Sequence, residues 1–304
     1  MKKRRQHYVW QNYLKPFCYQ EKMVYCLINQ QVKGISTKDV AVQKDIYRLK
    51  ELSKSEAEFL VHLFEAKDIN LINDLNRNWI KIFNVVFEIK NDTTIGSNAE
   101  IDTKIDDLEQ NLSEDLHMSI EDSGFAYLDY LYKEDTSFFL KDDDRAKFLL
   151  FLMVQYCRTI KMKEGISGID GRGHLAFDKA WNIMVFIMAT NVGMRIYAEK
   201  DQWELIGLRN STTTPFITSD QPIINLHVKD KPEDNAKLSD DEFELYYPVT
   251  PSFAVVLKKK KLSYMEYNNI DEQKISLLNH KIKKESFHHL FSNSYVYLES
   301  IKNA

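Results

Sequence analysis

The amino-acid sequence predicts an α+β fold, with a mainly helical body and a small, mostly antiparallel sheet near the C-terminus. Two observations lead to this prediction. The 304 residues include only 9 glycines and 6 prolines, and this scarcity favours long helices over a sandwich or barrel of many short strands. After Trp203 the pattern changes to short β-prone runs separated by turn residues, such as PFITSD, INLHV and FELYYPVTPSFAVVL.

Length and composition are those of a single soluble domain over residues 1–304. Apolar residues make up 44% of the chain and charged residues 28%, which are ordinary values for a globular protein. We expect the helical body over about 50–200 and the sheet-rich part over about 203–268. The N-terminal segment, 1–49, contains strand-like runs that can join this sheet.

Charge and cysteine content limit the possible partners and compartment. The net charge of −4 gives no overall basic field for nucleic acid, although it does not exclude a local basic cleft. Cys18, Cys26 and Cys157 are sparse and lack metal-type spacing, which favours a reduced, cytoplasmic compartment. The basic start is followed by no apolar run of signal-peptide length. The longest apolar stretches, 148–154 and 183–189, fall far short of the roughly 20 residues that cross a membrane.

The N-terminal segment begins with HYVWQNYLKPF (7–17), in which His7, Gln11 and Leu14 share one helical face before Pro16 ends the run. The next run, MVYCLIN, is typical of a strand, and a turn would lead into a second strand. Two interpretations of His7 stay open: a hydrogen-bonded structural histidine, or a general acid or base.

Two helical regions follow. Residues 53–87 have amphipathic spacing throughout, and we expect a loop over 91–98. Residues 101–124 are strongly acidic, with apolar residues in heptad-like spacing at Ile105, Leu108, Leu112 and Leu116. This spacing predicts a solvated helix that lies against the body or against a partner helix.

The stretch 145–163, RAKFLLFLMVQYCRTIKMK, is the most convincing helix in the chain. Its middle is apolar on nearly every side, which predicts a core helix. Gln155 and Arg158 lie one turn apart on this helix and therefore share a face. Burying an unpaired charge costs roughly several kcal/mol or more. A carboxylate, a carbonyl or a bound anion must therefore meet Arg158.

The remaining helical and loop expectations concern the second half. Residues 177–200 predict a second buried helix, with a break near 191–193, that packs antiparallel to the first. The glycine-rich stretch 164–174 suits a mobile linker better than a phosphate cradle, because it lacks the spacing of a phosphate-binding loop. We expect an exposed insertion over 228–240 and a final helix over 271–293.

The motif FITSDQPI (216–223) is the sharpest local signal. An apolar strand ends at small polar residues, and a rigid strand aims such residues well. We expect Asp220 to be the partner of Arg158. The pair would be either a structural clamp between sheet and helix, or a site in which Asp220 is acid, base or metal ligand and Arg158 binds phosphate. Ser219 lacks the context of a hydrolase nucleophile, and no spacing in the chain predicts a metal site.

Six blocks of the sequence carry a family resemblance: HYVWQNYLKPF, KDVAVQKDIYRL, QYCRT, FITSDQPI, YYPVTPSFAVVL and LLNHKI. Their order resembles the mainly bacterial family named domain of unknown function 4238. The family pattern has a proline where this chain has Trp10, and another where it has Ile160, and these departures affect backbone geometry more than chemistry. Members resemble genes near phage-defence loci, which implies a toxic effector or a nuclease-like activity. The positions that match the family's polar motif are His7, Gln155, Arg158, Ser219, Asp220 and Asn279.

These residues lead to two functional hypotheses. In the first, the protein is a nucleic-acid phosphodiesterase, in particular an RNase, that acts in defence against phage. His7 and Asp220 would transfer protons and Arg158 would stabilise charge on the phosphorane. The other three residues, Gln155, Ser219 and Asn279, would bind the substrate.

In the second hypothesis the protein is a non-enzymatic sensor or binding module with a structural Arg–Asp clamp.

The basic runs KKRR (2–5) and KKKK (258–261) would supply phosphate contacts under the first hypothesis. A role for Mg²⁺, the oligomeric state and a phage-derived trigger stay open at this point.

Overall fold

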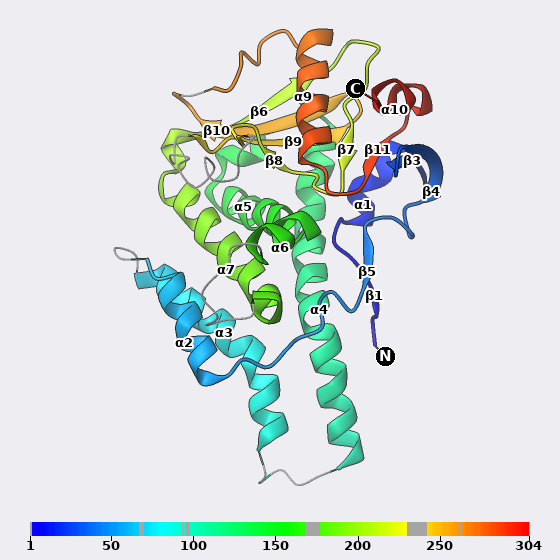
Figure 1. Ribbon diagram of the computed structural model, residues 1–304. Coiled ribbons are helices and arrows are strands. Elements are labelled where there is room, and N and C mark those ends of the chain that lie inside the picture. Colours follow the sequence, from blue (N-terminus) through cyan, green and yellow to red (C-terminus); the bar gives the residue numbers. More distant parts are fainter. Residues whose placement is uncertain are drawn as a thin grey trace.

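A computed structural model of the chain shows an α+β protein, as the sequence predicts (Figure 1). It describes residues 2–66, 70–92, 94, 98–167, 177–229, 242–261 and 263–303. The helices are α1 (Gln11–Leu14), α2 (Lys54–Leu63), α3 (Asn70–Asn91), α4 (Ala99–Tyr132), α5 (Asp142–Cys157), α6 (Ile160–Ser167), α7 (Phe177–Ala198), α9 (Glu272–Glu285) and α10 (Tyr295–Ile301), with short 3₁₀ turns η1 (Lys15–Phe17), η2 (Ser137–Leu140) and η3 (Lys200–Gln202).

The strands are β1 (Arg5–His7), β2 (Cys18–Gln20), β3 (Met23–Ile28), β4 (Gln31–Ser36), β5 (Val42–Lys44), β6 (Trp203–Arg209), β7 (Thr218–Ser219), β8 (Ile224–Asn225), β9 (Leu245–Thr250), β10 (Phe253–Lys259) and β11 (Leu290–Ser292). Within the described ranges they form three antiparallel sheets. One has the order β6-β10-β9-β8, one pairs β1 with β5, and the third has the order β2-β3-β11-β7 with β4 also paired to β3. The expected sheet is therefore correct for the C-terminal part, but strands also lie at the N-terminus, where β3 pairs with β11.

The core of the helical body is formed by α5 and α7, which pack against each other along much of their length. Both are apolar on most sides because both are enclosed: α3 covers α7, and α4 covers α5. Figure 1 shows α4 as the longest helix, running from the connection with α3 at one end of the molecule towards the sheet of β6, β8, β9 and β10 at the other. This course brings α4 into contact with the N-terminal segment, the core helices and β9.

Several predicted boundaries are wrong, and two of them concern α5 and α7. The helix expected over 145–163 ends at Cys157, and Arg158 caps it before α6 begins. Thr159 stands between the two helices, and its buried hydroxyl accepts from the Met162 N–H in the first turn of α6 at 3.4 Å and also bonds to Gln221. In contrast, α7 passes through 191–193 without a break, and Gly193 lies close to the backbone of Leu149 on α5.

Four other expectations fail or fall outside the described residues. The region 53–87 is divided into α2 and α3, and the helix expected over 271–293 ends at Glu285, after which Leu290–Ser292 pair as β11. Most of the loop 164–174 and of the insertion 228–240 lies outside the described residues.

Candidate functional site

The N-terminal segment is held along α4 by both backbone and side-chain hydrogen bonds. Strand β1 pairs with β5, so that His7 lies opposite Val42. The buried Gln6 side chain accepts from the Tyr47 backbone N–H at 2.8 Å and donates to the carbonyl of Gln110 at 3.3 Å. Because a buried amide must satisfy both of its ends, Gln6 fixes the distance between β1 and α4. His7 is thereby held beside the middle of this helix.

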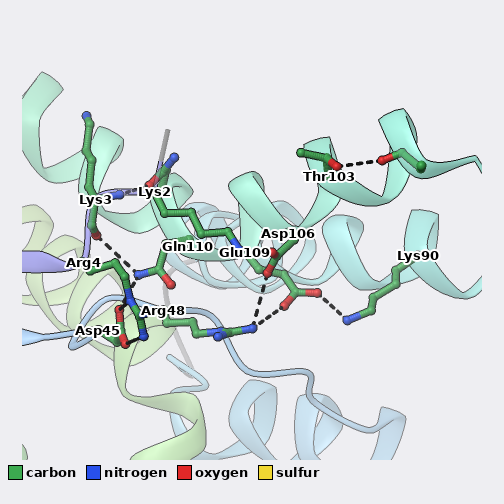
Figure 2. Close-up of polar contacts among 12 residues, drawn as sticks. Lys2, Lys3, Arg4, Asp45, Arg48, Lys90, Thr103, Asp106, Glu109 and Gln110 are labelled. Carbon is green, nitrogen blue, oxygen red and sulfur yellow. Dashed lines mark hydrogen bonds and ion pairs between the residues drawn. The ribbon is translucent and has the colours of Figure 1, made fainter.

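The basic run 2–5 is paired with carboxylates, two of them on α4, and Figure 2 shows the residues of the Lys2 and Arg4 pairs. Lys2 binds Asp106, and Lys3 lies 2.6 Å from Asp115. The remaining two pairs are Arg4 with Asp45 at 2.7 Å and Arg5 with Asp39 at 2.6 Å. The second basic run is also paired at its start, with Lys258 on Glu204 and Lys259 on Glu199. The geometry therefore does not favour the expectation that these runs contact phosphate.

Arg158 is buried, with 2% of its surface exposed, and its partner is Glu121. Its Nη1 lies 2.6 Å from Glu121 Oε1. Its other nitrogens donate to two backbone carbonyls, Nη2 to that of His7 at 2.8 Å and Nε to that of Tyr8 at 3.2 Å. The ring of Tyr47 lies under the guanidinium, with 5.9 Å between its centroid and Cζ. The predicted pair of Arg158 with Asp220 is wrong, because α4 supplies the carboxylate.

A cavity of about 290 Å³ opens beside this ion pair. Its walls come from the N-terminal segment, from α4 and from the end of α5. The lining residues are His7, Trp10, Gln11, Asn12, Glu114, His117, Glu121 and Arg158. Two carboxylates, two imidazoles and a guanidinium thus line one small space.

Burial shifts the pKa values of two ionisable side chains that line the cavity, Glu114 and His7. Desolvation raises the pKa of the Glu114 carboxyl to about 7, although the positive charge of Arg158 opposes this. Burial lowers the pKa of the His7 imidazole, despite the nearby backbone of Thr37 and Lys38. His7 Nδ1 lies 3.2 Å from Gln11 Nε2, which orients the ring. Near neutral pH the cavity therefore holds a neutral imidazole and a carboxyl group that is about half protonated.

His117 is enclosed, and neither of its ring nitrogens has a hydrogen-bond partner among the described residues. The ring lies between aromatic neighbours, 4.4 Å from Tyr47 and 4.9 Å from Phe186 between centroids. Burial and the charge of Arg158 lower the pKa of His117, so its ring is neutral. Since an unsatisfied buried polar group is costly, His117 marks a place where a ligand or a water molecule would be stabilised.

Asp220 lies in a different environment, away from Arg158. Its carboxylate is fully buried and accepts from the backbone N–H groups of Phe287, His288 and His289 at 2.8, 2.7 and 3.1 Å. His289 Nδ1 lies 3.2 Å from the same carboxylate. Asp220 thus holds the turn between α9 and β11. Ser219 beside it is also occupied locally, because its hydroxyl accepts from the Gln221 N–H and donates to the Gln221 carbonyl.

The last two predicted site residues do not line the cavity either. Asn279 joins α9 to the strand region, accepting from the Ile217 N–H and donating to the carbonyl of Pro215 and to the Tyr297 hydroxyl. Gln155 is buried in α5, and its Nε2 has no hydrogen-bond partner within the described residues. Of the six predicted residues, the structure brings only His7 and Arg158 to the cavity.

The prediction for α4 missed three cavity residues, Glu114, His117 and Glu121, because it followed only the apolar residues of this helix. Of those apolar residues, Ile105 is buried and Leu112 and Leu116 pack against the core, whereas Leu108 is exposed. The buried residues of α4 also include a polar line that runs Glu109, Ser113, His117 and Glu121. The sequence did contain a signal for these cavity residues, namely polar residues that continue an apolar line at helical spacing.

Two general findings apply to the described part of the chain. No group of three or more His, Cys, Asp or Glu side chains in it is arranged to hold a metal ion. None of its helices combines the length and the apolar character that crossing a bilayer requires.

A family model places the chain among known sequences. The model described as Protein of unknown function (DUF4238) matches residues 5–182, which is more than half of the 304 residues. The chain therefore belongs to this family, as its sequence blocks predicted. All eight cavity residues lie inside the matched range, whereas Ser219, Asp220 and Asn279 lie outside it. No curated protein and no solved structure matches the chain.

Proposed function

We propose that the protein is a nucleic-acid phosphodiesterase, specifically an RNase, whose active site is the cavity on α4. One observation carries the proposal: His7 and Glu114 line the same hollow of about 290 Å³ with complementary protonation states near neutral pH. General acid–base catalysis needs one group that accepts a proton and one that donates it, each with a pKa near the working pH.

RNA supplies its own nucleophile, so two proton-transfer groups suffice for the reaction. The neutral imidazole of His7 removes the proton of a ribose 2′-hydroxyl, and the 2′-oxygen then forms a bond to phosphorus. The bond from phosphorus to the 5′-oxygen breaks, and the protonated Glu114 carboxyl donates its proton to the leaving oxygen. The products are a 2′,3′-cyclic phosphate and a free 5′-hydroxyl.

Arg158 contributes through its charge rather than by direct contact. Its three guanidinium nitrogens already bind Glu121 and the carbonyls of His7 and Tyr8. The Arg158–Glu121 pair is neutral overall, so the cavity does not present two uncompensated carboxylates to a phosphate. The Glu121 carboxylate correspondingly reduces the stabilisation that the Arg158 charge gives to the negative charge on the phosphorane.

The biological setting is carried over from the resemblance and belongs to the same proposal. The enzyme would act in the bacterial cytoplasm as an effector of phage defence and would respond to a phage-derived trigger. The three free cysteines agree with a reduced compartment.

The test is incubation of the purified protein with mixed tRNA, messenger-like RNA and duplex DNA, with Mg²⁺ in one arm and EDTA in another. RNA cleavage that leaves cyclic phosphate ends, and that is reduced at least 100-fold in His7→Ala and Glu114→Gln, is the expected result. The matched control is Glu109→Gln, a buried carboxylate on the same helix that lies outside the cavity. Cleavage at the wild-type rate in Glu114→Gln would contradict the proposal.

A second candidate function is a non-enzymatic binding module or sensor. The observation that favours it is the Arg158 clamp, which uses a buried ion pair and two carbonyls to fix the N-terminal segment on the core. In that case the cavity would hold a ligand without transforming it. Binding of an oligonucleotide without cleavage on any substrate would support this function over the first.

A further inference from the structure

Helix α3 has an apolar stripe on a side that is exposed to solvent. The buried residues of this helix pack on α7 and α4. The stripe lies on another side and consists of Leu71, Leu75, Ile82, Val85 and Ile89. Between 37% and 55% of the surface of Leu71, Ile82, Val85 and Ile89 is exposed. Single exposed apolar residues are ordinary, but four of them in one line on one helix indicate a binding surface.

The spacing of this stripe is that of a coiled-coil seam. Its members lie alternately four and three residues apart, once Asn78 is counted as the one polar position. A helix that packs only on its own protein needs a single apolar face, and α3 already has one in the residues that contact α7 and α4. A second apolar face at heptad spacing therefore fits another helix as its occupant.

Two charged side chains flank the stripe on one side. Lys81 and Glu88 are exposed, and neither has an ion-pair or hydrogen-bond partner among the described residues. They are about 10 Å apart along the helix, which is too far for a bond between them. None of the residues three or four positions away from either carries the opposite charge. Each charge is therefore free to bind a group on a molecule that covers the stripe.

We infer that the α3 stripe binds a second copy of the chain, with the two α3 helices antiparallel. In an antiparallel coiled coil, flanking positions of the same type face each other. Lys81 of each copy then faces Glu88 of the other, and twofold symmetry forms this ion pair twice. The same alignment places Ile82 of each copy opposite Val85 of the other. The face is thus complementary to itself in charge and in apolar contact, which favours a second copy over an unrelated protein.

Other arrangements of two copies lose these ion pairs. In a parallel pair of helices, Lys81 would face Val86 of the second copy, which is a buried apolar residue. In the antiparallel alignment that is centred on Lys81, the two Lys81 side chains would face each other, and Asp74 would face Glu88, so like charges would repel. The inference is separate from the proposed function, because no residue of α3 lines the cavity.

The experiment is sedimentation velocity of the full chain at concentrations up to about 100 µM, because an interface of this size should bind in the micromolar range. The variants are Lys81→Glu, Glu88→Lys and Ile82→Glu, all at exposed positions, and circular dichroism checks that each is folded. The matched control is Val296→Glu, since Val296 is an exposed apolar side chain on α10, which Figure 1 shows far from α3. The decisive sample is an equimolar mixture of Lys81→Glu and Glu88→Lys, in which the two copies again present opposite charges.

We expect the wild type and Val296→Glu to dimerise and Ile82→Glu to remain monomeric. Lys81→Glu and Glu88→Lys should each weaken the dimer at least about tenfold, because like charges then face each other at both ion-pair positions. Their mixture should dimerise with close to wild-type affinity. A monomeric wild type at the highest concentration would overturn the inference, as would wild-type dimerisation of either charge variant or of Ile82→Glu, or a mixture that associates no better than its components.

Discussion

Two buried polar centres can be compared in this protein, and they differ in how far their hydrogen-bonding capacity is used. At the turn between α9 and β11, Asp220 accepts from three backbone N–H groups and meets His289. In the α4 cavity, both ring nitrogens of His117 lack partners in the described structure, and Glu114 has a raised pKa. Both centres are buried, yet only the second has polar groups that a ligand could still satisfy.

The comparison shows why buried polar residues in a sequence are ambiguous indicators of function. A buried centre whose polar groups are all hydrogen-bonded stabilises the fold, because each of its hydrogen bonds replaces a hydrogen bond to water. A buried centre with unpaired polar groups lowers the stability of the fold unless a ligand or water satisfies those groups. Proteins commonly keep such a loss of stability at sites where function requires it. Asp220→Ala should therefore lower the free energy of unfolding, whereas Glu114→Gln in the cavity should not lower it at pH 8, and this difference can be tested.

The largest expected effect is that of Asp220→Ala. This change leaves the N–H groups of Phe287, His288 and His289 without their acceptor, and we expect it to lower the free energy of unfolding by about 3 kcal/mol or more. Urea denaturation followed by circular dichroism measures the change. Asp220→Asn keeps one acceptor oxygen and should lower the free energy of unfolding clearly less than Asp220→Ala does. A loss below 1 kcal/mol for Asp220→Ala would show that the turn does not depend on this carboxylate.

The next effect concerns the ion pair that borders the cavity. Arg158→Met leaves the Glu121 carboxylate buried without its partner, and we expect a loss of about 3 kcal/mol. In the double variant Glu121→Gln/Arg158→Met no carboxylate is left unpaired, so part of the stability should return. Urea midpoints of the two single variants and the double variant give the coupling energy. If the double variant were no more stable than Arg158→Met, the pair would not be the source of the loss.

A smaller effect should appear in the dependence of stability on pH. The Glu114 pKa is about 7 in the folded protein and near 4.5 in the unfolded chain, so between these values the folded state binds more protons. The stability that this group contributes is complete below about pH 4.5 and is lost as the pH rises through 7. Glu114→Gln cannot ionise, and we expect its Tm to exceed that of the wild type at pH 8 but not at pH 5. A Tm difference that does not change with pH would mean that the Glu114 pKa is not raised.

The smallest effect is expected at the N-terminal basic run. The pairs of Lys2 with Asp106 and Lys3 with Asp115 are solvent-exposed, and exposed pairs contribute little. We expect Lys2→Ala/Lys3→Ala to keep Tm within about 3 °C of the wild type and to leave RNA cleavage unchanged. Differential scanning calorimetry and the cleavage assay check both parts. Loss of cleavage in a folded variant would assign these lysines to substrate binding.

The sequence was sufficient for the helical body because its strongest signals are local. The apolar residues of α5 and α7 predict enclosed helices, and both helices form the core. Arg158 was correctly expected to need a partner, because the cost of burying an unpaired charge holds for any protein. Which carboxylate meets Arg158 depends instead on tertiary contacts between segments far apart in the chain, and periodicity does not encode those.

The polar residues of α4 show the same limit. Leu112 and Leu116 give a regular apolar spacing and pack against the core, but this spacing does not show that His117 and Glu121 are buried as well. His117 lies against Tyr47 and Phe186, and Glu121 meets Arg158, all of which are far away in the sequence. Asp220 was placed in the site because a carboxylate at a strand end suits catalysis. Its actual partners are backbone N–H groups, which have no sequence signature.

The most direct test of this account compares Glu114→Gln and Asp220→Asn in one experiment that measures both RNA cleavage per folded molecule and urea stability. We predict that Glu114→Gln loses cleavage while its stability at pH 8 is equal to or higher than that of the wild type. Asp220→Asn should lose stability while its folded fraction still cleaves RNA. The opposite pattern, with wild-type cleavage in Glu114→Gln and abolished cleavage in fully folded Asp220→Asn, would place the active site at the turn between α9 and β11 and contradict the account.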